Sequence, residues 1–263
     1  MIFHSSFQNS YLWLPLIGLI VGFVGSMIGG GGGFVFPPAL MLIFKVPAHV
    51  AVATSLAATL PICLLGAAAH YNKGNLNVST GLTFGLAGII GALSGVIVIR
   101  WLTPDQLENA FGIYLTLLAL FMIFVNNKDK SKTRKTSQSI SLSRVTPKSS
   151  FFGFTGGLIS GTFGTSGTAP VLAGLLAINL PLKFVAGTSL MIIFINTVSA
   201  LAGHLILGVI DLTLVLFLTI GTIIGALAGP KLTTVIKIGS KEGLIRYAFA
   251  SLILVFGVVM IIF

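Results

Sequence analysis

The sequence predicts an all-α polytopic membrane protein built from two homologous halves. Of its 263 residues, 55% are hydrophobic and only 8% are charged, whereas a soluble domain has about 25% charged residues. The apolar residues form eight continuous stretches of about 20 residues, the length that a membrane helix needs, and lack the alternation of membrane β-strands. A set of residues also recurs at a constant offset of 134 positions, which indicates an internal duplication.

The eight apolar stretches are expected to be the membrane helices. They cover residues 11–28, 48–70, 78–99, 107–125, 151–178, 184–207, 212–230 and 244–263. A glycine-rich run follows the first stretch, from Gly29 to Gly33, and another lies within the fifth. Because consecutive glycines weaken a helix, we expect the first element of each half to be broken, which also allows a re-entrant course. For the isolated glycines Gly88, Gly91 and Gly95, tight helix packing is the favoured interpretation.

The repeat defines the expected domain organisation. Pro47, Thr54, Ser55, His70, Gly74 and Asn77 recur as Pro181, Thr188, Ser189, His204, Gly208 and Asp211. We expect a first transmembrane repeat at residues 1–126, a linker at 127–149 and a second repeat at 150–263. The turn after the third helix of the second repeat is basic (Lys231, Lys237, Lys241 and Arg246 against Glu242), whereas Arg100 at the equivalent turn is balanced by Asp105 and Glu108. This difference favours inverted over parallel repeats.

The net charge of +10 is concentrated in the linker. Seven of the fifteen Lys and Arg residues lie between Lys128 and Lys148, with only Asp129 opposing them. An excess of positive charge in a loop places that loop in the cytoplasm, so this basic segment is expected to set the topology and not to bind nucleic acid. Residues 1–10 contain neither Lys nor Arg and no small-residue cleavage site, so we expect the first span to be retained.

The polar residues inside the apolar stretches indicate an anion site. All five acidic residues fall at expected helix ends or in loops, whereas cation carriers commonly need a carboxylate within the membrane. Glycine-run N–H groups and a following helix N-terminus can bind an oxyanion. Ser and Thr hydroxyls could instead bond to their own helix backbone, but their recurrence in both repeats favours binding. The predicted substrate-binding residues are Gly30, Gly31, Gly32, Gly33, Thr54, Ser55, Thr165, Ser166, Gly167, Thr168, Thr188 and Ser189.

Three further residues are predicted to form a gate or proton path: His70, His204 and Asn196. Each histidine follows its Thr-Ser pair by about sixteen positions, about 24 Å along a helix, so it is expected near the opposite membrane face. Each could titrate as part of a gate or cap carbonyls at its helix C-terminus. The solitary Cys63 and the absence of His-carboxylate clusters predict no metal site and no cofactor. The chain also lacks recognisable catalytic motifs, so we do not expect an enzyme.

The sequence resembles the sulfite exporter TauE/SafE family. The matching text is Ile28-Gly29-Gly30-Gly31-Gly32-Gly33-Phe34-Val35-Phe36-Pro37, Ala53-Thr54-Ser55-Leu56, Gly66-Ala67-Ala68-Ala69-His70, Gly187-Thr188-Ser189-Leu190 and Gly203-His204. The resemblance implies a multi-pass permease of the plasma (inner) membrane for sulfur-containing anions such as sulfite or organosulfonates, with protons as a candidate coupling ion. In the second copy, Gly161 to Gly167 departs from a pure glycine run by adding hydroxyls.

The leading functional prediction is therefore a secondary transporter that moves a small anion through a lipid bilayer by alternating access. Two alternatives stay open at this point. One is a channel-like anion pore, and the other is a non-transporting membrane partner or sensor that keeps the permease fold.

Overall fold

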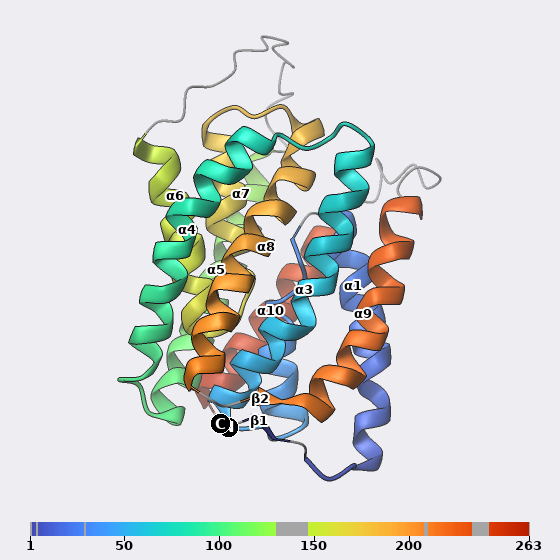
Figure 1. The fold of residues 1–263 in the computed structure, drawn as a ribbon, viewed down its shortest axis with the longest axis vertical. Helices are drawn as coiled ribbons and strands as arrows, with labels where there is room; N and C mark the ends of the chain where they lie inside the picture. Colours follow the sequence, from blue (N-terminus) through green and yellow to red (C-terminus); the bar gives the residue numbers. More distant parts are fainter. Residues whose placement is uncertain are drawn as a thin grey trace.

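A computed structural model describes residues 2–3, 5–28, 30–129, 147–207, 210–232 and 242–262. Figure 1 shows a bundle of long helices. The elements are β1 (Ile2–Phe3), η1 (Asn9–Trp13), α1 (Leu14–Ile28), α2 (Phe36–Pro38), η2 (Ala39–Ile43), α3 (Ala48–Asn72), α4 (Val78–Ile99), α5 (Pro104–Asp129), α6 (Pro147–Phe163), α7 (Thr168–Ala177), α8 (Leu182–Leu207), β2 (Ile210–Asp211), α9 (Leu212–Leu232) and α10 (Glu242–Ile262).

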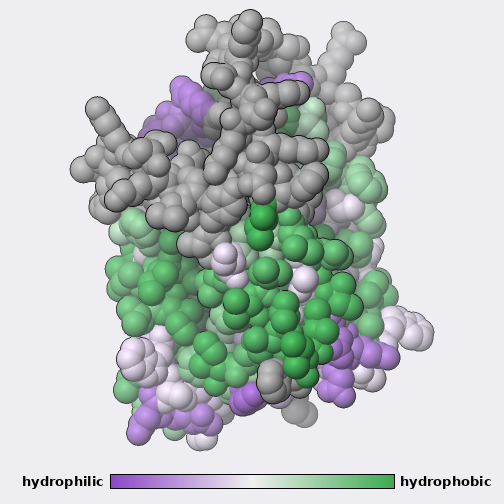
Figure 2. All heavy atoms as spheres, turned by 180° about the vertical axis from the view of Figure 1, so that it is seen from behind, coloured by the Kyte–Doolittle hydropathy of each residue, from purple (hydrophilic) through white to green (hydrophobic). Residues whose placement is uncertain are grey.

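The bundle has the surface of a membrane protein. Five helical segments of the described chain are long and apolar enough to cross a bilayer: Asn9–Ser26, Ala48–Asn72, Val78–Ile99, Lys183–Ile206 and Leu212–Gly229. Large apolar side chains face outward, such as Leu86 and Ile90, each 64% exposed. Figure 2 shows a broad hydrophobic band with hydrophilic residues gathered at the lower end. The prediction of an all-α polytopic membrane protein is confirmed at this level.

The centre of the bundle is formed by α3 and α8, which pack against each other. Their directions are opposite: in Figure 1, α3 rises from the lower end of the molecule and α8 descends from the upper end. Helix α9 packs against α3, α4 packs against α8, and α5 packs against α10. Because the two central helices are covered on several sides, side chains such as Leu56 and Ile192 are fully buried.

Two pairs of helices cross in very close contact, α4 with α6 and α1 with α9. A Cβ atom added to Gly91 of α4 would overlap the carbonyl oxygen of Phe154 in α6, and one added to Gly225 of α9 would overlap that of Leu19 in α1. Glycines allow such approach because they lack Cβ atoms, as is common where membrane helices associate. The interpretation of Gly88, Gly91 and Gly95 as packing positions agrees with these contacts.

The N-terminal segment contacts β2 and the start of α9. Strand β1 pairs in parallel with β2, with Phe3 opposite Asp211. The backbone N–H of Ser5 donates to Asp211 Oδ1 over 3.3 Å, and Thr213 Oγ1 donates to the Ser5 carbonyl over 3.1 Å. Asp211 Oδ1 also accepts from the Thr213 N–H at the start of α9, as an N-cap residue does. This short two-stranded sheet is an addition to the predicted all-helical plan.

A non-helical segment follows the first apolar stretch, and another lies within the fifth. Helix α1 ends at Ile28 and helical structure resumes at Phe36, while α6 ends at Phe163 and α7 begins at Thr168. The apolar stretch 151–178 therefore contains two helices. The short helices α2 and η2, residues 36–43, were not among the eight predicted stretches. Gly29, Gly208, residues 130–146 of the linker and the side chains of Lys231, Lys237, Lys241, Glu242 and Arg246 lie outside the described parts.

Candidate functional site

The two non-helical segments meet inside the bundle. We name residues 30–35 the first break, residues 164–167 the second break, and their contact region the crossing. Ser166 Oγ donates to the carbonyl oxygen of Gly30 over 3.0 Å, and Thr168 Oγ1 donates to the same oxygen. A Cβ atom added to Gly33 would lie 3.1 Å from the backbone nitrogen of Ser166. The glycines of the first break thus allow its backbone to lie directly against the second break.

Ser55 of α3 links the two breaks. Its hydroxyl oxygen lies 2.8 Å from the Gly164 carbonyl oxygen and 3.1 Å from that of Gly33, and its side chain is fully buried. A hydroxyl carries one proton, so Ser55 donates to one of these carbonyls at a time or shares its proton between them. One turn further on, Thr59 Oγ1 donates to the Ser55 carbonyl over 2.8 Å. A single serine therefore holds both breaks to the central helix.

The conformation of the breaks requires glycine at two positions in particular. Gly31 has φ +64° and Gly167 has φ +57°, a left-handed conformation that residues with a Cβ atom rarely adopt. At Gly167 a Cβ atom would also overlap the Gly156 carbonyl oxygen of α6. Gly167 is the N-cap of α7, and no side chain caps this helix start. The first-turn N–H groups of α7, which have no partner within the helix, consequently lie beside the crossing.

The other predicted binding residues are divided between different environments. Thr54 is fully buried, and its Oγ1 has no hydrogen-bond partner among the described residues. Thr188 Oγ1 instead accepts from the Asn77 backbone N–H over 2.9 Å, which links α8 to the start of α4. Ser189 is fully buried and its Oγ lies 3.4 Å from the Ala186 carbonyl. Thr165, 1% exposed, lies beside the Tyr114 phenol of α5.

The two predicted gate histidines lie on the central helices α3 and α8 and contact different partners. His204 of α8, 5% exposed, has its Nε2 atom 2.8 Å from the Gly161 carbonyl in the last turn of α6 and faces His49 of α3 closely enough for electrostatic interaction. His70 of α3 packs against the start of α8, where a Cβ atom on Gly187 would lie 2.7 Å from His70 Cβ. His70 is distant from Thr54 and Ser55 along its own helix. It is nevertheless close to Thr188, because α3 and α8 run in opposite directions.

The crossing offers neutral donors. Of the carboxylates with described side chains, Asp211 is buried at the sheet end of the bundle, and Asp105 and Glu108 lie at the start of α5. The groups at the crossing are the hydroxyls of Ser55, Ser166 and Thr168 and backbone N–H groups of the two breaks. These donors now hold backbone carbonyls, and they are chemically suited to an oxyanion when those carbonyls are released.

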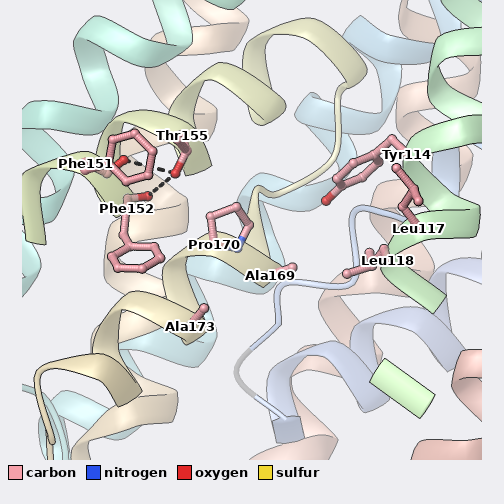
Figure 3. A pocket seen from close by; sticks show the side chains of 9 residues that line it. All are labelled: Tyr114, Leu117, Leu118, Phe151, Phe152, Thr155, Ala169, Pro170 and Ala173. Carbon is pink, nitrogen blue, oxygen red and sulfur yellow. Dashed lines mark hydrogen bonds between the residues drawn. The ribbon is translucent and has the colours of Figure 1, made fainter. Parts of the chain in front are cut away.

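An apolar groove lies behind the start of α7, between α5, α6 and α7. It has a volume of about 360 Å³ and is lined by Tyr114, Leu117, Leu118, Phe151, Phe152, Thr155, Ala169, Pro170 and Ala173 (Figure 3). The Thr155 hydroxyl in this groove is bonded to the carbonyls of Phe151 and Phe152. A second apolar groove of about 260 Å³ lies between α1, η2 and α10. Because both linings are almost wholly apolar, neither groove is suited to bind an anion.

Sequence reasoning missed several residues that shape the site. Thr59 and Asn77 contribute hydrogen bonds, and Gly156 gives the second break its close contact with α6. Gly156 could have been noticed because it lies three residues after Gly153, in a helix where Gly153, Gly157 and Gly161 are spaced four apart as membrane helix contacts are. Thr59 carries no such signal, because the position 134 residues later is Ile193.

Apolar helices of bilayer length, surrounding two interrupted segments that meet in the interior, define a polytopic membrane protein of the transporter type. The profile of the family described as sulfite exporter TauE/SafE matches residues 14–260. The chain belongs to this family of membrane transporters, which is not a family of enzymes.

Curated relatives agree with this assignment. The probable membrane transporter protein YdhB of Bacillus subtilis is 30% identical over 246 residues, covering 92% of this chain and 97% of the relative. A probable membrane transporter protein of Methanocaldococcus jannaschii is 27% identical, covering 95% and 96%. The probable membrane transporter protein YunE of Bacillus subtilis is 27% identical, covering 84% and 87%. No solved structure gave a significant match.

Proposed function

We propose that this protein is a secondary transporter of small sulfur-containing anions, such as sulfite or organosulfonates, and that the crossing is its binding site. The observation that carries the proposal is the position of Ser55, whose hydroxyl reaches carbonyls of both breaks. Neutral hydroxyl and N–H donors with no neighbouring described carboxylate favour an anionic guest. The family assignment supports membrane transport, and the family description supports sulfite as the first substrate to test.

The proposed mechanism is alternating access between two halves, residues 1–126 and 150–263, in inverted orientation. The opposite directions of α3 and α8 in Figure 1 support inversion. The reciprocal packing of α4 on α6 and of α9 on α1 supports a two-fold relation between the halves, because each pair joins the third long helix of one half to the first helix of the other. The ends of α5 and α9 and the starts of α6 and α10 lie at one end of the bundle in Figure 1, and we assign that end, with the basic linker, to the cytoplasmic face of the plasma (inner) membrane.

Proteoliposomes containing the purified protein test this function. Uptake of labelled sulfite, sulfate, thiosulfate and methanesulfonate would be measured with and without a pH gradient, because protons are the candidate coupling ion. We expect saturable flux of at least one sulfur anion and trans-stimulated counterflow. Linear, unsaturated conductance would replace the transporter by a channel-like pore. Absence of flux for every anion in sealed, folded preparations would contradict the proposal and favour a non-transporting partner or sensor.

The Thr-Ser pairs provide the site test. Thr54→Val combined with Thr188→Val keeps side-chain size but removes both hydroxyls, and we expect sulfite flux to fall while expression is retained. Unchanged flux would remove both threonines from the site. For the histidines, His70→Gln combined with His204→Gln would alter the pH profile of flux if they form a gate or proton path, and leave it unchanged if they only support the helices.

A further inference from the structure

Asn196 is a buried amide in the middle of α8 whose hydrogen-bonding groups are unused. Its side chain is fully buried, and neither Nδ2 nor Oδ1 has a hydrogen-bond partner among the described residues. A buried amide without partners is destabilising relative to a satisfied one, because its lost contacts with water are not replaced. An apolar residue of similar volume would avoid this penalty, so stability alone does not explain an asparagine at this position.

Glycines on two neighbouring helices leave room for the Asn196 side chain. Helix α4 presents Gly88, where an added Cβ atom would overlap Asn196 Oδ1, and helix α6 presents Gly156, where it would lie 3.7 Å from Nδ2. The same Cβ position on Gly156 is 3.2 Å from the Gly167 carbonyl oxygen and 2.8 Å from Val171 Cγ2. The amide therefore lies next to the second break and the first turn of α7, whose N-cap provides no side-chain cap.

The equivalent place in the other half has no amide. At the offset of 134 residues, Asn196 corresponds to Ile62, Gly88 to Thr222 and Gly156 to Gly22. Ile62 and Thr222 are both fully buried, and a Cβ atom on Gly22 would lie 2.6 Å from the Thr222 carbonyl oxygen. The helices therefore pack closely at this position with Ile62 in place of the amide and Thr222 in place of Gly88. The buried Asn196 amide, with Gly88 opposite it, is present in one half only, and this asymmetry points to a role in recognition.

We propose that Asn196 is the specificity-determining residue of the crossing, donating from Nδ2 to an oxygen of the anion held at the second break. This assignment rests on the proposed transport function. The first-turn N–H groups of α7 supply further neutral donors on the same side of the anion. The amide donates to an oxyanion without introducing a fixed positive charge that would retain the anion. Recognition by a side-chain amide is therefore confined to the second half, because Ile62 occupies the equivalent position of the first half.

The test compares Asn196→Leu and Asn196→Asp with Thr219→Val, in full-length protein reconstituted into proteoliposomes with sulfite and methanesulfonate as probes. Thr219 is the matched control, because its buried Oγ1 also lacks a partner but lies on α9. We expect Asn196→Leu to fold with a melting temperature at or above that of the wild type and to raise the KM for sulfite at least tenfold. Asn196→Asp should abolish flux through charge repulsion, and Thr219→Val should keep the wild-type KM.

A second variant keeps the proposal testable if Asn196→Leu fails to fold. Gly88→Ala displaces the amide in a chain that still contains it, and should also raise the KM. A wild-type KM in a folded Asn196→Leu variant, or in Gly88→Ala, would overturn the role of Asn196 while leaving the transport function intact. If the wild-type protein neither transports the two anions nor is stabilised by them against thermal unfolding, the proposed function and this inference fail together.

Discussion

Replacing Ser55 with alanine is the most direct perturbation of the crossing. The substitution deletes one buried oxygen and leaves the α3 backbone unchanged. In the wild type this oxygen lies within hydrogen-bond distance of the Gly33 and Gly164 carbonyls, which belong to different breaks. The variant therefore loses the side-chain contact through which α3 holds both segments at once.

The expected loss of stability follows from burial and geometry. Ser55 is fully buried and its contact with Gly164 is 2.8 Å long, so the carbonyls lose a donor that water cannot readily replace. Leaving a buried acceptor unsatisfied is destabilising by about 1–3 kcal/mol, whereas interhelical hydrogen bonds in membrane proteins contribute about 0.6 kcal/mol on average. Because two carbonyls share this donor, we expect about 1–2 kcal/mol.

Ser94→Ala is the matched control for Ser55→Ala. Ser94 is partly exposed on α4 and donates over 2.8 Å to the Ile90 carbonyl of its own helix, so its loss should change stability by less than about 0.5 kcal/mol. Both variants would be unfolded reversibly in mixed micelles, and initial rates of sulfite flux would be measured in proteoliposomes. Equal stabilities and equal fluxes for the two variants would refute the reasoning that Ser55 holds the crossing together.

Three further substitutions test packing, pairing and capping, each followed by reversible unfolding in mixed micelles. Gly91→Ala places a Cβ atom on the Phe154 carbonyl of α6, and overpacking of this kind should destabilise the protein by about 1–3 kcal/mol; wild-type stability would mean that α4 and α6 are not in close contact. Thr188→Val loses the bond from the loop before α4 and should be destabilising by about 1 kcal/mol, whereas Thr54→Val, with no bond to lose, should not; equal effects would contradict this asymmetry. Asp211→Ala removes the N-cap of α9, so the free energy of unfolding should fall by about 0.5–2 kcal/mol. Amide hydrogen exchange in the N-terminal segment should also become faster, and an unchanged exchange rate would mean that Asp211 does not anchor this segment.

Local sequence signals predicted the main elements well. Apolar length located α3, α4, α8 and α9, and α1 ends at Ile28, directly before the run of glycines. Glycine runs are informative because backbone conformation depends on the missing Cβ atom and not on distant residues. Gly31 and Gly167 were predicted as binding residues on the same grounds, and both have positive φ; their role in binding stays a prediction. Ser166 and Thr168 were predicted as donors, although the carbonyl that they contact, Gly30, was identified only by the fold.

Contacts between the halves could not be derived in the same way. Thr54 and Thr188 are equivalent in sequence, yet only Thr188 has a hydrogen-bond partner, Asn77. At the other end of the bundle, the residue equivalent to Asn77 is Asp211, which pairs with β1. A two-residue strand has no periodic signal in the sequence. Which of the two threonines is hydrogen-bonded is therefore decided by contacts in the fold and not by their equivalent places in the sequence.

The chemistry of the crossing links anion binding to opening under the proposed function. Each hydroxyl has one proton, and Ser55, Ser166 and Thr168 now donate theirs to backbone carbonyls of the breaks. An anion that accepts hydrogen bonds from these hydroxyls must replace the carbonyls as their acceptor. The hydrogen bonds that hold the breaks together are therefore lost as the substrate is bound. A ligand shifts a conformational equilibrium only through such a difference in affinity between two states. A carboxylate at the crossing would hold these donors permanently, which gives a physical reason for a site made of neutral groups.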